Sequence, residues 1–232
     1  TSSIYYNSFL DLSGKGTIAC NLKNKKQFRK ELENLFAHGV TNPVCYQHFS
    51  NKEALGKVLE MKNEIGMGGQ PLYYAYGIQI GNPTSPAALE SLENRVKEVI
   101  EFVKSYGVTE VYFYGSIDEA QGEKLKSQRP VWEAVHEAGG KIFGAGFKSR
   151  KGKPGNFDLV GDIQDVLNCA YEPSKEEAEK WHSVGHKIFS YANPQSGAEE
   201  PETYRRNFGL LLWQNDYDGA MDFAYMNNWQ RV

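Results

Sequence analysis

Short apolar runs alternate with helical patterns from one end of the 232-residue chain to the other. The runs are rich in β-branched and aromatic residues, and the stretches between them carry apolar residues at the spacing of one helical face. We interpret the runs as eight strands, over residues 4–6, 43–46, 72–80, 111–114, 141–147, 166–171, 188–193 and 219–225. Strands separated by helices pair in parallel, because the chain has to cross back between them.

Eight parallel strands predict an α/β fold of the (β/α)8 TIM-barrel type, because eight strands close around an interior that their own side chains fill. The length suits one such domain, which we place over residues 1–232. The rival fold is an open, doubly wound sheet, but no glycine-rich fingerprint follows the first strand. Residues 226–232 are too few for a closing helix. Either the barrel lacks its last helix, or the chain is a piece of a longer protein.

Composition and charge narrow the classes of function. The formal net charge is −3, with lysine and arginine spread along the chain, so we expect no nucleic-acid partner. No apolar run is long enough to span a membrane. Three cysteines without close spacing predict neither a disulfide framework nor a zinc site, and Cys45 and Cys169 are expected in the core. His182 and His186 are four residues apart but lack an acidic partner, so we expect no metal and no cofactor.

Tyrosines gather at the carboxyl ends of the predicted strands, the end at which (β/α) barrels hold their active sites. Tyrosine combines a flat apolar face with a hydrogen-bonding tip, which suits the C–H faces and hydroxyl edges of a sugar. We therefore expect a carbohydrate pocket here, unless these aromatic residues belong to an interface. Trp213, late in an apolar run, is equally compatible with the core. The candidate binding residues are Tyr46, His48, Tyr76, Tyr114, Tyr171, Tyr191, Asn193, Trp213 and Tyr225.

Two adjacent acids, Asp118 and Glu119, follow the fourth strand and Gly115. One interpretation is helix capping, since carboxylates favour a helix N-terminus. The helical pattern begins only after Gln121-Gly122, however, which favours catalysis. Glycosidic cleavage needs a general acid and a group that stabilises an oxocarbenium-like centre. Because neighbouring strand side chains diverge, adjacent acids suit a mechanism in which the sugar's own 2-acetamido oxygen attacks and no protein nucleophile is needed.

The stretch YFYGSIDEA, residues 112–120, resembles the catalytic strand of glycoside hydrolase family 123, the β-N-acetylgalactosaminidases. YRRNFG (204–209), LW (212–213) and DGAMD (218–222) are similar to the final helix and strand of that family, and YANPQ (191–195) fits between them in order. The resemblance extends through most of the chain, although only the Asp-Glu segment and the Arg-Arg/Trp segment are distinctive.

The resemblance implies a retaining hydrolase for β-linked N-acetylhexosamine, first of all N-acetylgalactosamine, in a glycolipid, glycoprotein or polysaccharide. It implies that Asp118 orients the acetamido group and that Glu119 is the acid/base, with Tyr171 or Tyr191 at the acetamido oxygen. A secreted, periplasmic or cell-surface location is also implied. Members of the family usually carry an additional β-sandwich domain with no counterpart in these residues, so a further domain outside this chain is expected.

Two other functions are compatible with the same fold. One is a carbohydrate-binding barrel that has lost catalysis, although the presence of both acids, Asp118 and Glu119, is an argument against it. The other is a sugar-phosphate isomerase or aldolase, which would require a cluster of metal ligands or a Schiff-base lysine inside the barrel. Lys148 is the only lysine that the pattern places at a strand end.

Overall fold

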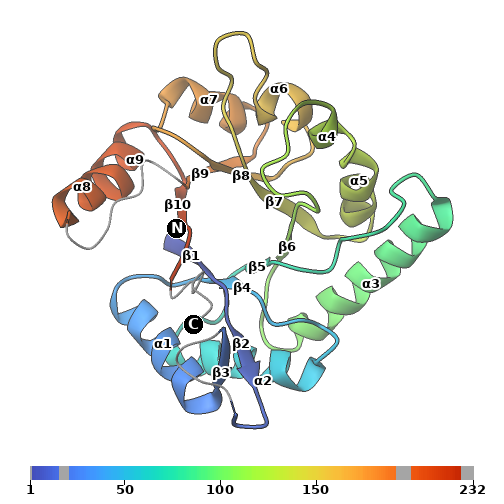
Figure 1. Ribbon diagram of the computed structural model, residues 1–232, viewed down its shortest axis with the longest axis vertical. Helices are drawn as coiled ribbons and strands as arrows, with labels where there is room; N and C mark the ends of the chain where they lie inside the picture. Colours follow the sequence, from blue (N-terminus) through green and yellow to red (C-terminus); the bar gives the residue numbers. More distant parts are fainter. Residues whose placement is uncertain (1, 16–20, 192–199, 226–232) are drawn as a thin grey trace.

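The structure, a computed structural model, describes residues 2–15, 21–191 and 200–225. Its centre is a closed barrel of parallel strands in the order β1-β10-β9-β8-β7-β6-β5-β4 (Figure 1). The barrel strands are β1 (Ser2–Tyr6), β4 (Val44–Cys45), β5 (Leu72–Tyr74), β6 (Val111–Tyr114), β7 (Lys141–Gly146), β8 (Val166–Cys169), β9 (Lys187–Ser190) and β10 (Gly219–Asp222). The predicted (β/α)8 fold is confirmed, and the open sheet is wrong.

Helices surround the barrel and connect its strands (Figure 1). They are α1 (Lys25–Ala37), α2 (Lys52–Ile65), α3 (Pro86–Lys104), α4 (Gly122–Lys126), α5 (Arg129–Glu137), α6 (Asn156–Val160), α7 (Lys175–Ser183), α8 (Pro201–Arg205) and α9 (Leu211–Gln214), with the π-helical turn η1 (Arg206–Leu210) between the last two. Within the described residues, no helix follows β10 and none is long and apolar enough to cross a membrane.

Four helices, α1, α2, α3 and α7, begin at a residue whose side chain caps the helix. Asn24 accepts the Gln27 amide at 3.0 Å at the start of α1, and Asn51 accepts the Ala54 amide at 3.0 Å at the start of α2. These side chains satisfy amides that have no partner inside the helix. Local capping therefore places the helix starts close to where the periodicity predicts them.

Several features differ from the predicted pattern. The predicted strands over residues 166–171 and 219–225 end earlier, at Cys169 and Asp222. The predicted strand over residues 72–80 is too long, because Gly77 adopts φ +111° and turns the chain toward α3 after β5. In addition, β2 (Phe9–Asp11) and β3 (Leu22–Asn24) form a small parallel sheet between β1 and α1. Each of these two strands has only three residues, which is too short to produce a recognisable alternation.

Side chains alternate between the barrel interior and the helical layer, as the geometry of a strand requires. On β6, Tyr112 belongs to the interior cluster, whereas Phe113 belongs to the outer core. The Tyr73 ring fills the interior by contacting the rings of Tyr112, Phe143 and Phe189, with centroids 5.2, 5.3 and 5.9 Å away. The interior below the carboxyl end of the barrel is therefore packed with aromatic side chains.

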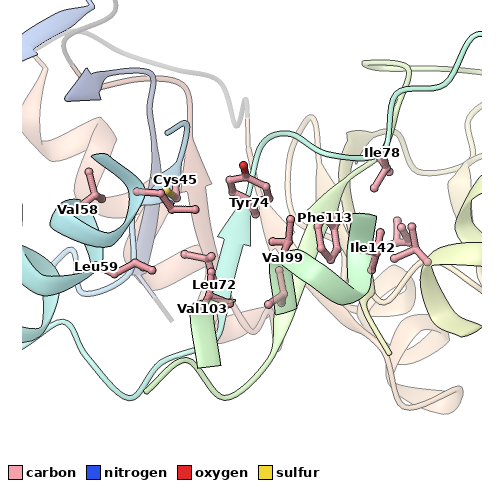
Figure 2. Packing of buried hydrophobic residues seen from close by; sticks show 14 of the residues in the cluster. Cys45, Val58, Leu59, Leu72, Tyr74, Ile78, Val99, Val103, Phe113 and Ile142 are labelled. Atoms are coloured by element: carbon pink, nitrogen blue, oxygen red, sulfur yellow. The ribbon is translucent and has the colours of Figure 1, made fainter. Parts of the chain in front are cut away.

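The outer core lies between the strands and the helices. Figure 2 shows Leu72 and Tyr74 of β5 and Phe113 of β6 lying close to Val99 and Val103 of α3. All of these side chains are at most 1% exposed. This packing fixes the strand ends, and therefore the loops that follow them, relative to the barrel. Cys45 and Cys169 are buried free thiols, as predicted.

Candidate active site

A cavity of about 290 Å³ lies at the carboxyl end of the barrel. We call it the central cavity. It is lined by aromatic side chains from the strand ends, by two alanines and by both candidate catalytic acids. The lining residues are Tyr5, Tyr46, Ala75, Tyr114, Asp118, Glu119, Ala145, Tyr191 and Phe223. The predicted residues Tyr46, Tyr114, Asp118, Glu119 and Tyr191 are thus brought together at one site.

Small residues on two strands make room for this cavity. Ala75, directly after β5, and Ala145 on β7 lie on either side of Tyr114 at the end of β6. The Tyr5 ring, only 4% exposed, lies beneath them and contacts the rings of Tyr114 and Tyr191, each 6.2 Å away. The site is therefore a hollow with aromatic walls rather than a continuation of the packed interior.

Residues 115–120 carry the two acids in a loop that is anchored at several points. The Gly115 amide donates to the Phe143 carbonyl at 2.8 Å and so extends the pairing of β6 with β7. The buried side chain of Gln128, next to the start of α5, accepts the Ile117 amide at 2.7 Å and the Ser116 hydroxyl at 3.1 Å. These hydrogen bonds define the course of the backbone just before the acids.

The backbone of Glu119 explains how two neighbouring side chains reach one cavity. In a regular strand, adjacent side chains point to opposite faces. Glu119 has φ +46°, in the left-handed region that residues other than glycine seldom adopt. Residues 115–121 are outside β6, so the alternation of strand side chains does not apply to them, and the chain turns at Glu119. Asp118 and Glu119 both line the central cavity. A backbone conformation of this kind costs roughly 1–3 kcal/mol and is typical of functional sites.

Neither acid serves as a helix cap. Helix α4 begins at Gly122, and its cap residue is Gln121, which makes no side-chain capping hydrogen bond. Asp118 and Glu119 precede this position and line the central cavity instead. The helix-capping interpretation is therefore wrong.

Each acid has a tyrosine as its hydrogen-bond partner. The Tyr114 hydroxyl donates to Asp118 Oδ1, and the Tyr191 hydroxyl donates to the Glu119 carboxylate. Burial, then the charge of Glu119, raises the pKa of Tyr191 to about 12. Burial, then the neighbouring Tyr5 and Asp118, raises the pKa of Tyr114 well above its usual value. Both phenols therefore remain neutral hydrogen-bond donors near neutral pH.

These tyrosines make the fold sensitive to alkaline conditions. Burial raises the pKa of Tyr5, Tyr46, Tyr114 and Tyr191 above the ordinary value of about 10. A group whose pKa is raised in the folded state contributes stability that is complete below its unfolded pKa and is lost as the pH climbs toward the folded one. We expect most tyrosinate absorbance to appear cooperatively above about pH 10, together with loss of the circular dichroism signal. Gradual ionisation with full circular dichroism would contradict the burial of these rings.

Two predicted binding residues lie beside the central cavity rather than in its lining. Tyr76 is half-buried, and its ring contacts Tyr46, with centroids 5.9 Å apart. On its other side it contacts the His48 ring at 5.5 Å. His48 lines a separate cavity outside the barrel. Tyr76 and His48 therefore lie between the central cavity and this second cavity.

The remaining predicted residues lie elsewhere. Tyr171 is 40% exposed and packs between Phe147 and the Arg150 guanidinium, which is 3.6 Å from its ring centroid. The Tyr225 hydroxyl accepts a hydrogen bond from Asn34 at 2.8 Å, on the α1 side of the barrel. Trp213 is 81% exposed, so the core interpretation of this residue is wrong, and it is not among the lining residues. Asn193 lies outside the described residues.

Four lining residues were not predicted from the sequence: Tyr5, Ala75, Ala145 and Phe223. The alternation of strand side chains was the available signal for Ala75, Ala145 and Phe223, because each lies two residues after an interior residue of its own chain segment. On β1 no such neighbour distinguishes Tyr5 from Tyr6. Among the described residues, no lysine lines the central cavity, and Lys148 donates instead to the Glu172 carbonyl. The described residues also contain no group of three or more His, Cys, Asp or Glu side chains arranged to hold a metal ion.

No protein-family model matches the chain, and no curated protein sequence matches it. A sugar phosphate isomerase/epimerase from Parabacteroides distasonis has a similar structure, with a TM-score of 0.56 and 11% identity over 99% of this chain and 92% of that one. A GH113 β-1,4-mannanase is similar with a TM-score of 0.50 and 11% identity, over 100% of this chain and 89% of the mannanase. A Ruminococcus gnavus sialic acid aldolase is similar with a TM-score of 0.46 and 12% identity. The match includes 95% of this chain but only 66% of the aldolase. At these identities the similarity shows the (β/α)8 fold alone.

Proposed function

We propose that the protein is a retaining glycoside hydrolase that cleaves β-linked N-acetylhexosamine, first of all N-acetylgalactosamine, with the help of the substrate's 2-acetamido group. The observation that carries the proposal is the placement of Asp118 and Glu119, adjacent in sequence, at one aromatic-walled cavity. The resemblance of residues 112–120 to the catalytic strand of glycoside hydrolase family 123 supports the same assignment.

The size and lining of the central cavity suit one sugar unit. Ligand sites commonly have volumes of roughly 300–1,000 Å³, and the central cavity, of about 290 Å³, is just below the lower end of that range. The rings of Tyr46, Tyr114, Tyr191 and Phe223 offer apolar faces to the C–H groups of a pyranose. The two carboxylates supply acceptors for its N–H and O–H groups.

In the first step, the acetamido oxygen attacks C1 and the glycosidic C1–O bond breaks. Glu119 gives its proton to the leaving oxygen, while the Asp118 carboxylate accepts the acetamido N–H and stabilises the positive charge that develops there. In the second step, water attacks C1 and passes a proton to Glu119, and the C1–O bond to the acetamido group breaks. Two displacements at C1 retain the anomeric configuration.

Tyr191 is the tyrosine that we assign to the acetamido oxygen. It lines the central cavity next to Glu119, and its raised pKa keeps its one hydroxyl proton in place. That proton turns from Glu119 to the acetamido oxygen when the substrate binds. Tyr171, the alternative left open by the sequence, packs against Phe147 and Arg150 outside the cavity lining.

The test is hydrolysis of aryl β-glycosides of N-acetylgalactosamine, N-acetylglucosamine and galactose. We expect release of the aryl group from the two acetamido sugars, faster for N-acetylgalactosamine, and inhibition by the thiazoline analogue of that sugar. The galactoside, which has no acetamido oxygen, should be cleaved at least about 10²-fold more slowly, because its attacking group is missing. Comparable cleavage of the galactoside would overturn the substrate-assisted mechanism, and no cleavage of any of the three would overturn the hydrolase assignment.

A further inference from the structure

The two most exposed large apolar side chains of the described residues lie on one helix. Trp213 is 81% exposed and Leu210 is 54% exposed. Both belong to the continuous helix that α8, η1 and α9 form from Pro201 to Gln214. Single exposed apolar residues are ordinary, but adjacent ones that include a tryptophan are typical of a surface that binds another protein. The mechanism described above uses neither residue.

The helix that carries these residues is attached to the barrel on its other side. The Tyr204 hydroxyl donates to Asp222 at the end of β10, and the Tyr204 ring stacks on Phe208 with centroids 4.8 Å apart. Leu212 is 6% exposed and belongs to the same buried cluster as Trp181 of α7. The exposed face is therefore held in place before any partner binds, which lowers the entropy cost of association.

The same helix lacks a helical neighbour on one side. In Figure 1, α7 is the next helix on one side of it, and α1 is the next one around the barrel on the other side. Within the described ranges no helix follows β10, so no helix lies between α9 and α1. A complete (β/α)8 barrel has a helix at this place in its outer ring. The described part of this chain therefore leaves room for a second molecule beside α9.

The exposed face of this helix is complementary to itself. Arg205 and Arg206 are exposed about one turn before Leu210, and Trp213 is exposed about one turn after it. Gly209 is also exposed, and a Cβ built on it would meet no described atom within 4 Å, so another helix can approach closely there. Two such helices that run antiparallel, with the two Leu210 side chains in contact, bring the arginines of each copy to Trp213 of the other.

This arrangement pairs groups that attract one another. A guanidinium over a tryptophan ring forms a cation–π interaction, and two-fold symmetry makes the same contact twice. Exposed acids accompany the two arginines, because Glu200 and Glu202 precede them and Asp216 follows α9. The face therefore has no excess of positive charge that would favour a nucleic acid or an anionic membrane surface.

We propose that the protein forms a two-fold symmetric dimer in which the α8–η1–α9 helices of two copies pack antiparallel through Leu210 and Trp213. The helix is roughly 20 Å long, and a large aromatic side chain buries about 150–250 Å². The contact of two such helices is then on the order of 1,000 Å², at the low end for a specific interface. We therefore expect a reversible dimer. Its formation does not depend on the proposed function.

Sedimentation equilibrium over a range of protein concentrations measures the association. For the parent protein we expect the mass to rise from that of one 26.2-kDa chain to that of two. The midpoint should be on the order of 1–100 μM, as for other small interfaces. Trp213→Ala should weaken association at least about 30-fold, as expected for an interface hot spot that is lost from both copies. Leu210→Asp should abolish it, because two carboxylates would meet at the symmetry axis.

Val184→Asp is the matched control for Leu210→Asp. Val184 is a 44% exposed apolar residue at the end of α7, outside the proposed interface. This variant should associate like the parent. Well below the dissociation constant, where every protein is monomeric, the melting temperatures of all three variants should match that of the parent. This comparison separates lost association from lost folding.

Cross-linking tests the antiparallel arrangement itself. Leu210→Cys is made in a Cys20→Ser background, in which the other free thiols, Cys45 and Cys169, are buried. On mild oxidation we expect a disulfide-linked dimer, because the symmetry axis brings the two introduced thiols together and a disulfide needs Cα atoms within about 7 Å. Val184→Cys in the same background should remain a single chain.

Three outcomes would overturn the proposal. One is a parent protein that keeps the mass of a single chain at every concentration, whether or not it binds vesicles of anionic lipid. Another is a dimer that persists unchanged in both Trp213→Ala and Leu210→Asp, which would place the interface elsewhere. The third is a dimer in which Leu210→Cys does not cross-link, which would contradict the position of the symmetry axis.

Discussion

We expect Glu119→Gln to lower kcat/KM for an N-acetylhexosaminide with a poor leaving group by about 10²–10⁴-fold, the usual contribution of a positioned general acid. Glutamine keeps the size of the side chain and an oxygen that can accept the Tyr191 hydrogen bond. It cannot give a proton to the departing oxygen. With an activated aryl leaving group, which departs without protonation, the loss in the bond-breaking step should be much smaller. The measurement is the rate for a series of aryl glycosides with leaving groups of decreasing acidity.

The matched control for this variant is Glu123→Gln. Glu123 is an exposed acid on α4, four residues further along the chain, and pairs with Lys126 at 2.9 Å outside the central cavity. Its replacement should leave all rates unchanged. If Glu119→Gln kept the parent's turnover with the poorest leaving group, Glu119 would not be the acid.

For Asp118→Asn we expect kcat/KM for acetamido sugars to fall by about 10²–10³-fold, the range expected for loss of one charge-stabilising group. The reason is the loss of the negative charge that stabilises the acetamido nitrogen while its oxygen attacks C1. Asparagine retains an oxygen for the Tyr114 hydroxyl, so the pocket should keep its shape. In contrast to Glu119→Gln, the loss should be similar for good and poor leaving groups, because attack by the acetamido oxygen is needed with both.

Asp216→Asn provides the control for charge removal. Asp216 is exposed between α9 and β10 and has φ +58°, a backbone conformation that asparagine readily adopts. We expect unchanged kinetics in this variant. If Asp118→Asn kept the parent's activity on acetamido sugars, Asp118 would not orient the acetamido group. This conclusion would hold whatever the result for Glu119→Gln.

The barrel could be predicted from the sequence because its determinants are repeated and local. Each strand carries its own apolar run, and the longer helices carry their own amphipathic spacing, so an error in one element does not change the number of strands. The small sheet of β2 and β3 could not be predicted, since three-residue strands have no detectable period. The end of β5 was misplaced because residues 75–80 remain apolar and aromatic after Gly77 has turned the chain.

The candidate site could be predicted in part. Strand-end position was enough to find both acids, but it could not decide which of two adjacent tyrosines, Tyr5 or Tyr6, faces the interior. Strand-end position also gave no reason to prefer Tyr191 over Tyr171 as the tyrosine at the acetamido oxygen. Tyr191 directly follows β9 and continues the inward alternation of Phe189, whereas Tyr171 follows β8 with φ +74°, which turns it outward. The positive φ of Tyr171 accounts for the different positions of the two tyrosines, and the residue type alone does not predict it.

The two alanines beside Tyr114 have a consequence for how such a barrel can diversify. Ala75 and Ala145 set the width of the hollow, yet neither takes part in proton transfer or in stabilising charge. Exchanging either methyl group for a larger side chain would alter which ring substituents are admitted while leaving both acids in place. Under the proposed mechanism, the residues that set the width of the cavity and the residues that carry out the chemistry lie on different segments of the chain. A substitution at Ala75 or Ala145 would then change the preferred glycan without altering Asp118 or Glu119.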